Sequence, residues 1–106
     1  MTYLVKERAS GRIIARGEPD QNVFKFEGNW YFKAEAVDLS HLKITERTYT
    51  CPYKGICYWI DLETPEGTQA QNIAWVYRDP KPGYEKIKDR VAFYTRDTTG
   101  TIPVVE

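Results

Sequence analysis

Residues 50–59 read Thr50-Cys51-Pro52-Tyr53-Lys54-Gly55-Ile56-Cys57-Tyr58-Trp59, a stretch that holds both cysteines of the chain, a proline, a glycine and a lysine. Pro52 fixes its own φ and favours an extended conformation at Cys51. Gly55 permits a positive φ that residues with a Cβ resist. The stretch therefore predicts a strand that ends near Cys51, a tight corner, and a second strand that begins after Gly55.

Two strands follow the corner, at residues 56–63 and 68–77, and the turn 64–67 joins them. Gly67 can adopt the positive φ that such a turn requires. Because side chains alternate between the two faces of a strand, each strand divides into two sets. The sets are Ile56, Tyr58, Ile60 and Leu62 against Cys57, Trp59, Asp61 and Glu63, and Ala70, Asn72, Ala74 and Val76 against Gln71, Ile73, Trp75 and Tyr77.

The composition of the chain is that of a folded globular protein. Its 106 residues predict one domain, residues 1–106, and 42% of them are hydrophobic and 28% charged. Aromatic residues make up 14% of the chain, which favours strands and binding surfaces. Fifteen basic and fifteen acidic residues cancel, so no nucleic-acid partner is expected.

The apolar runs of the sequence are short. None approaches the length of a membrane-spanning helix, and residues 1–8 lack the apolar core of a signal peptide. We therefore expect a cytoplasmic protein with no membrane partner.

The segments before the corner predict two hairpins. Residues 3–8 and 12–16 flank Gly11, and residues 23–26 and 30–33 flank Glu27-Gly28-Asn29. The residues expected to fill much of the core are Phe24, Phe26, Tyr31 and Trp30 from the second hairpin, and Tyr58 and Val76 from the long strands. Trp59 and Trp75 lie on partly polar strand faces, where an exposed or half-exposed tryptophan would be the more informative observation.

Asp38 precedes a short helical turn, for which it is a suitable N-cap. His41, the only histidine, is expected to be a partly exposed loop residue rather than a catalytic base. Further strands are predicted at 44–50, 91–94 and 102–106, and a short helix at 83–90. The sequence thus predicts a mainly β, compact antiparallel domain of about eight strands with one short helix, built as a small barrel or sandwich.

The two cysteines are expected to be free thiols, as is usual in a reducing compartment. A structural zinc site takes about four ligands, and Cys51, Cys57 and His41 are the only cysteine and histidine residues in the chain. We expect no metal and no cofactor.

Several strings of the sequence resemble the family called domain of unknown function 427. They are Thr50-Cys51-Pro52-Tyr53-Lys54-Gly55, Tyr58-Trp59, Ala74-Trp75-Val76-Tyr77-Arg78-Asp79-Pro80 and Val91-Ala92-Phe93-Tyr94, with looser matches at Gly11-Arg12-Ile13-Ile14-Ala15, Tyr31-Phe32 and Val37-Asp38. The resemblance covers nearly the whole chain. It implies a bacterial or fungal protein with a compact all-β fold, similar to the β-tent domains but without their paired Cys-x-x-Cys zinc ligands.

Two features depart from the family pattern. Tyr31-Phe32-Lys33-Ala34 stands where the family shows Tyr-Phe-Pro-Arg, and Cys57 stands where it usually has a small residue. Cys57 therefore inherits no family role. The activity of the family is not established, although it is sometimes labelled a nucleotidyltransferase.

The corner and the strand pair suggest a binding site. The candidate ligand-binding residues, Tyr53, Lys54, Trp59, Trp75 and Tyr77, could form an aromatic-walled pocket with one cation. Such a pocket suits a planar or anionic small molecule. The alternative is that Tyr53 and Trp75 merely pack the corner against the second hairpin, with Lys54 solvated.

An enzyme is the second hypothesis, and no catalytic residue is assigned. A nucleophilic Cys51 would need a base, but the only histidine lies ten residues upstream without a triad signature. Asp61 and Glu63 share a strand face, as metal-binding carboxylates of a nucleotidyltransferase would, yet no glycine-rich phosphate loop precedes them. A third hypothesis is a protein-interaction module or homodimer that uses exposed tryptophan.

Overall fold

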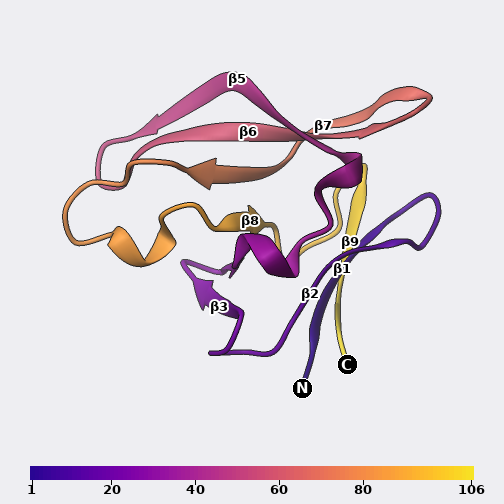
Figure 1. The fold of residues 1–106 in the computed structure, drawn as a ribbon, viewed down its shortest axis with the longest axis horizontal. Coiled ribbons are helices and arrows are strands. Elements are labelled where there is room, and N and C mark those ends of the chain that lie inside the picture. The colour runs from indigo at the N-terminus through magenta and orange to yellow at the C-terminus, as the bar shows by residue number, and fades with distance from the viewer.

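The structure is a computed structural model that describes residues 1–106 and contains nine strands in two sheets (Figure 1). All strand pairs are antiparallel. The three-stranded sheet has the order β2-β1-β9, and the six-stranded sheet the order β3-β4-β8-β7-β6-β5. The strands are β1 Tyr3–Glu7, β2 Ile13–Gly17, β3 Val23–Phe26, β4 Asn29–Phe32, β5 Leu42–Cys51, β6 Gly55–Thr64, β7 Gly67–Tyr77, β8 Val91–Phe93 and β9 Thr101–Val105.

The predicted mainly β antiparallel architecture is confirmed, with nine strands rather than about eight. The only helical segments are single 3-10 turns at Ala34–Ala36, Leu39–His41 and Glu85–Ile87. None of them is long or apolar enough to cross a membrane. In Figure 1 the strands β1, β2 and β9 run steeply down one side of the molecule, whereas β5, β6 and β7 run across its top.

Both predicted N-terminal hairpins form. Gly11 has a φ of 75° in the β1–β2 turn. The β3–β4 turn contains only Glu27 and Gly28, with φ of 52° and 81°, as two-residue hairpin turns require. Asn29 already belongs to β4, where it pairs with Phe26.

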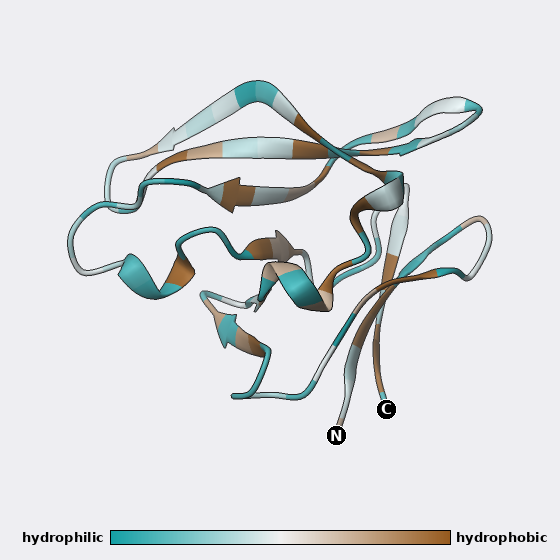
Figure 2. Cartoon of the chain, in the orientation of Figure 1, coloured by the Kyte–Doolittle hydropathy of each residue, from teal (hydrophilic) through white to brown (hydrophobic).

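The main core lies between the two sheets. Val5 and Ile14 of the small sheet meet Phe32, Phe93 and Val76 of the large one, and all five are 2% exposed or less. Each such side chain contributes about 1.5–3 kcal/mol by leaving water. The hydrophobic stretches of β1 and β6 to β9 accordingly stand out in Figure 2, whereas the hairpin tips are hydrophilic.

A second cluster covers the opposite face of the six-stranded sheet. Its buried members are Tyr31, Cys57, Trp75, Tyr77, Ile87 and Ala92. Phe24 and Phe26 pack at its edge and are only half-buried, so the prediction that they fill the main core is wrong. They lie on a short edge strand, where one flank stays open to solvent. Trp30 and Tyr31 are buried as predicted, on opposite faces of β4.

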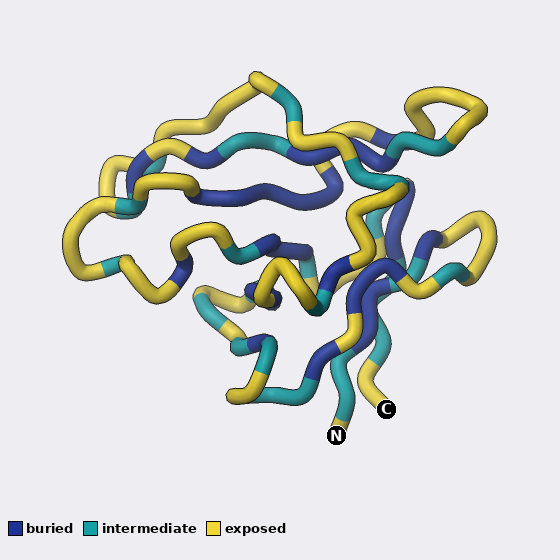
Figure 3. Tube along the Cα trace, in the orientation of Figure 1, coloured by how far each residue is buried: buried dark blue, intermediate teal, exposed yellow.

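The long strands depart from strict alternation. Ile56 is 48% exposed because it lies at the corner, beyond the end of the core. Ile73 and Ala74 are both buried, because Asn72 has a φ of 56° and shifts the β6–β7 register. Val76 is buried as predicted, and Tyr58 packs against the core while half-buried. Figure 3 shows the contrast between the buried β7 and the exposed edge strand β5.

The helix predicted over residues 83–90 is limited to the turn Glu85–Ile87. Gly83 and Asp89 on either side have φ of 96° and 58°, which a continuing helix cannot accommodate. Ile87 is fully buried and fixes this loop on the second cluster. The predicted N-cap is confirmed, since the side chain of Asp38 accepts a hydrogen bond from the backbone N–H of Ser40.

Candidate functional site

The corner between β5 and β6 has the predicted form. Cys51 pairs with Gly55, and Gly55 has a φ of 106°. The carbonyl of Lys54 accepts a hydrogen bond of 2.9 Å from the backbone N–H of Lys81. The Nζ atom of Lys81 donates to the carbonyl of Pro52 at 3.0 Å. The corner is therefore fixed to the loop that follows β7.

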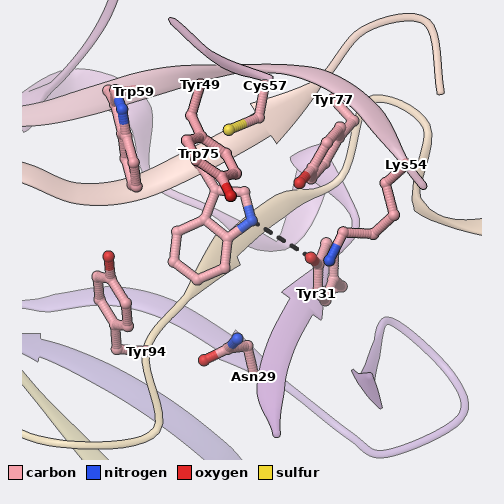
Figure 4. A pocket seen from close by; sticks show the side chains of 9 residues that line it. All are labelled: Asn29, Tyr31, Tyr49, Lys54, Cys57, Trp59, Trp75, Tyr77 and Tyr94. Carbon is pink, nitrogen blue, oxygen red and sulfur yellow. Dashed lines mark hydrogen bonds between the residues drawn. The ribbon is translucent and has the colours of Figure 1, made fainter. Parts of the chain in front are cut away.

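A pocket of about 180 Å³ opens beside this corner, on the outer face of the six-stranded sheet. Strand register brings its residues together, because directly opposed residues of antiparallel strands point to the same side. One row across the sheet contains Tyr31, Ala92, Trp75 and Trp59, and the next contains Tyr77, Cys57 and Tyr49. The pocket is lined by Asn29, Tyr31, Tyr49, Lys54, Cys57, Trp59, Trp75, Tyr77 and Tyr94 (Figure 4).

Tyr31, Cys57, Trp75 and Tyr77 form the floor of the pocket and are 1–6% exposed. The indole Nε1–H of Trp75 donates a hydrogen bond of 3.3 Å to the hydroxyl of Tyr31, and their rings meet edge to face. Trp75 is buried although its strand face is partly polar, because Tyr31 and Tyr94 cover its ring. Figure 4 shows this indole at the centre of the site.

Trp59 and Tyr94 form one side of the rim, and both are half-buried. Their ring centroids lie 6.1 Å and 4.8 Å from that of Trp75. Tyr49 adds a third rim ring that is 54% exposed. A planar molecule that enters the pocket would therefore meet aromatic faces on its floor and its sides.

Lys54 supplies the only cation of the lining, and its ammonium group forms an ion pair with Glu27. The lysine side chain is 15% exposed, and Nζ lies 5.9 Å and 5.8 Å from the ring centroids of Phe26 and Tyr77. Burial opposes the charged form of Lys54, but the hydrogen bond to Glu27 and the nearby Tyr31 outweigh it and raise its pKa. The alternative of a solvated Lys54 is therefore wrong.

The tyrosines of the floor remain neutral hydrogen-bond donors. Burial raises the pKa of Tyr31, although the Trp75 hydrogen bond and Lys54 act against it. Burial is also the largest cause that raises the pKa of Tyr77, followed by the neighbouring Cys57. Together with Lys54, these protonated hydroxyls can donate hydrogen bonds to a ligand.

Lys54, Trp59, Trp75 and Tyr77, four of the five residues predicted for the site, line this pocket. Tyr53 does not line it and is instead 72% exposed at the tip of the corner. Its exposure also excludes the packing role considered for it. The other lining residues were not predicted from the sequence. Side-chain alternation was a signal for three of them, since Asn29 and Tyr31 share one face of β4 and Cys57 shares a face of β6 with Trp59. The missed residues are Asn29, Tyr31, Tyr49, Cys57 and Tyr94.

Cys51 lies just outside the pocket, and both cysteines are free thiols. Burial works against ionisation of Cys51, but backbone N–H groups of Lys54 and Tyr53 and the Lys54 charge lower its pKa. The histidine that could serve as its base is elsewhere, since His41 Nδ1 lies 2.8 Å from a Glu7 carboxylate oxygen. His41 is half-buried at the end of a 3-10 turn, as predicted.

The Asp61 and Glu63 pair does not form a shared carboxylate site. Asp61 is 3% exposed and accepts hydrogen bonds from Arg47 Nη2 at 2.5 Å and from the backbone N–H of Asn72 at 3.0 Å. These bonds stabilise the irregular part of β6 and β7, where Asn72 has its positive φ. Glu63 instead forms an ion pair with Lys43, whose Nζ lies 3.9 Å from Glu63 Oε2. No group of three or more His, Cys, Asp or Glu side chains is arranged to hold a metal ion.

Comparison with known protein families identifies the family of the chain. The model of the family described as a domain of unknown function, DUF427, matches residues 3–102. The chain therefore belongs to this family, as the sequence strings predicted. No curated protein matches the chain.

Proposed function

We propose that this protein is a binding module for a small molecule with one planar ring. The ring lies against Trp59, Trp75 and Tyr94, and its polar or anionic substituent points towards Lys54 and Tyr77. One observation carries the proposal: a buried aromatic floor and a half-exposed aromatic rim enclose a pocket with a single cation. Binding pockets typically combine an apolar lining with a few such polar groups.

The size of the pocket supports a ligand with one ring. Its volume is about 180 Å³, compared with roughly 150 Å³ for a protein cavity that holds benzene. The aromatic side chains can stack on a planar ring or meet it edge to face. A nucleoside triphosphate is larger than this volume and would extend well beyond the pocket.

Nucleotidyl transfer is the less favoured alternative for a second reason. That chemistry uses carboxylates to hold the metal ions that bind phosphate oxygens. The buried carboxylate of Asp61 is already engaged by Arg47 and Asn72 in a structural role. Binding without catalysis therefore agrees better with the arrangement of the side chains. A cytoplasmic location is part of the proposal, because free thiols suit a reducing compartment.

Calorimetric titration with single-ring probes tests the proposal. We expect the wild-type protein to bind benzamide or benzoate, and to bind the non-planar cyclohexanecarboxylate more weakly. Removal of one stacking ring in Trp59→Ala should weaken binding of the planar probes about two- to tenfold, since an aromatic contact contributes about 0.5–1.5 kcal/mol. Tyr53→Ala, at the exposed tip of the corner, is the matched control and should bind as wild type does.

Two outcomes would contradict this function. The first is that no planar probe binds the wild-type protein. The second is that wild type and Trp59→Ala bind the planar probes with equal affinity. Light scattering on the same samples tests the alternative of a homodimer through Trp59. A dimer that dissociates in Trp59→Ala would favour an interaction role for the rim.

A further inference from the structure

The ion pair at the edge of the aromatic pocket is unequally buried. Lys54 is 15% exposed and Glu27 is 48% exposed. Glu27 is the one hydrogen-bond acceptor at the Lys54 ammonium, which could donate three such bonds. A lysine whose side chain is mostly shielded from water gains from an anionic acceptor, whereas a half-exposed carboxylate returns to water at little cost. The buried partner is thus the fixed one, and the exposed partner can be exchanged.

The backbone around Glu27 allows its side chain to leave without movement of the hairpin. Glu27 and Gly28 form the two-residue turn between β3 and β4. Thr95 Oγ1 donates a hydrogen bond of 2.7 Å to the Gly28 carbonyl, which anchors the turn beside the pocket residue Tyr94. The Glu27 carboxylate has no partner other than Lys54. Rotation of one exposed side chain is therefore enough to release the ammonium.

We propose that Glu27 holds the place of a ligand carboxylate, and that the ligand of this pocket is a monocyclic carboxylate whose anion displaces Glu27 from Lys54. This inference rests on the proposed function, because it requires a ring among Trp59, Trp75 and Tyr94. The exchange conserves charge, since one carboxylate leaves the ammonium as another arrives. A neutral ring gains nothing from it, and a cationic ring is repelled by Lys54.

Tyr31 provides a second contact for the incoming carboxylate. Figure 4 shows its hydroxyl beside the Lys54 ammonium, at the end of the Trp75 indole. That hydroxyl accepts the hydrogen bond from Trp75 Nε1, so its own proton is free to be donated. A carboxylate on a ring that lies over Trp75 would accept from both Lys54 and Tyr31. Glu27 is therefore a residue that determines specificity, through competition for the anion position.

Benzoate and benzamide test this inference, because they share a planar ring and differ in charge. Their affinities are measured by calorimetry for wild type, Glu27→Gln, Lys54→Met and the control Glu66→Gln. Glu66 is exposed at the β6–β7 turn, so its substitution makes the same charge change away from the pocket. Thermal denaturation of each variant verifies that it is folded.

Removal of the competing carboxylate in Glu27→Gln should strengthen benzoate binding about two- to fivefold, the range set by an exposed ion pair. Benzamide binding should stay within about a factor of two in the same variant. Glu66→Gln should match wild type for both probes. Lys54→Met should weaken benzoate about tenfold or more, because a charge-assisted hydrogen bond is lost.

The results separate this inference from the proposed function. If neither probe binds the wild-type protein, both the proposed function and this inference are wrong. If the ring binds but Glu27→Gln leaves benzoate affinity unchanged or lowers it, only this inference is wrong. If Lys54→Met does not fold, a salt titration of the wild-type protein takes the place of this variant. Benzoate affinity should then fall as ionic strength rises, while benzamide affinity stays the same.

Discussion

The two faces of the six-stranded sheet have different roles, although the same strands form both. On β4, Trp30 and Phe32 point into the core between the sheets, while Tyr31 points into the pocket. On β7, Val76 lies in the core and Tyr77 lines the pocket. One side is dry and mostly aliphatic, with a single buried polar side-chain atom that lacks a partner, Trp30 Nε1. The other carries hydroxyls, a thiol and an ion pair.

The difference shows how a strand can separate stability from function. Core side chains stabilise the fold in proportion to the apolar area they bury. Pocket side chains keep polar groups that a dry core would penalise, and they leave part of their surface open. Alternation along β4 and β7 allows each role to change with little effect on the other. Substitutions on each face test how completely the two roles are separated.

The largest effect is expected in the core. Phe32 is fully buried, so Phe32→Ala should lower the free energy of unfolding by about 3–5 kcal/mol, through lost burial and a residual cavity. Urea denaturation measures the change. Trp59→Ala on the pocket rim is the comparison and should lose clearly less. Equal losses would mean that the pocket face is as much a part of the core as the inner face.

Gly55 affects both stability and the pocket, because its conformation forms the corner that carries Lys54. An added Cβ would meet only ordinary contacts of 3.5–3.6 Å, so its φ of 106° decides the cost of substitution. We expect Gly55→Val to lose about 1–3 kcal/mol of stability. Thr50→Val, at an exposed position of β5, is the control and should have the same urea denaturation midpoint as the wild-type protein. An unchanged midpoint for Gly55→Val would show that the corner tolerates a side chain.

High pH should lower the stability of the protein through the titrating groups of the pocket face, not through the core. Burial raises the pKa of Tyr31 and of Tyr77, so these hydroxyls keep their protons when folded and lose them when unfolded. Unfolding then releases protons, and stability falls as pH rises above about 10. The ion-paired Lys54, whose pKa is also raised, acts in the same direction.

Urea midpoints measured between about pH 8 and pH 11 test this dependence. Tyr77→Phe should show a smaller alkaline loss than wild type, because one of the responsible hydroxyls is gone. Phe32→Leu, a core substitution without a titrating group, should keep the full loss. A wild-type midpoint that does not change over this range would contradict the burial argument.

The smallest effect is expected at Tyr53, which belongs to neither face. Its side chain is 72% exposed and lies outside the pocket, so Tyr53→Ala should change stability by less than about 0.5 kcal/mol. Urea denaturation measures this change. A loss above about 1 kcal/mol would indicate that the corner depends on this ring.

Local patterns predicted much of this arrangement. The Pro52 and Gly55 pair predicted the corner, and the alternation in β6 and β7 brought Trp59, Trp75 and Tyr77 close to one another. The β-prone segments and their glycine turns predicted the mainly β fold. These features depend on backbone preferences of neighbouring residues, which a sequence displays directly.

The remaining features depend on contacts between distant segments. The pairing of Lys54 with Glu27 joins a corner to a hairpin tip 27 residues earlier, and no local pattern reports it. Trp75 is buried because Tyr31 and Tyr94 from other strands cover it. The irregular register of β6 and β7 accompanies the positive φ of Asn72 and its hydrogen bond to Asp61, and it reverses the predicted alternation over a short stretch.

The three tryptophans provide the most direct test, because one lies in the core and two lie in the pocket. Their indole N–H signals can be followed separately by nuclear magnetic resonance during titration with benzoate. We expect the signals of Trp59 and Trp75 to shift with the added probe, whereas the signal of Trp30 stays in place. Shifts confined to Trp30, or no shift of any indole at saturating benzoate, would contradict the assignment of the outer face as the binding site.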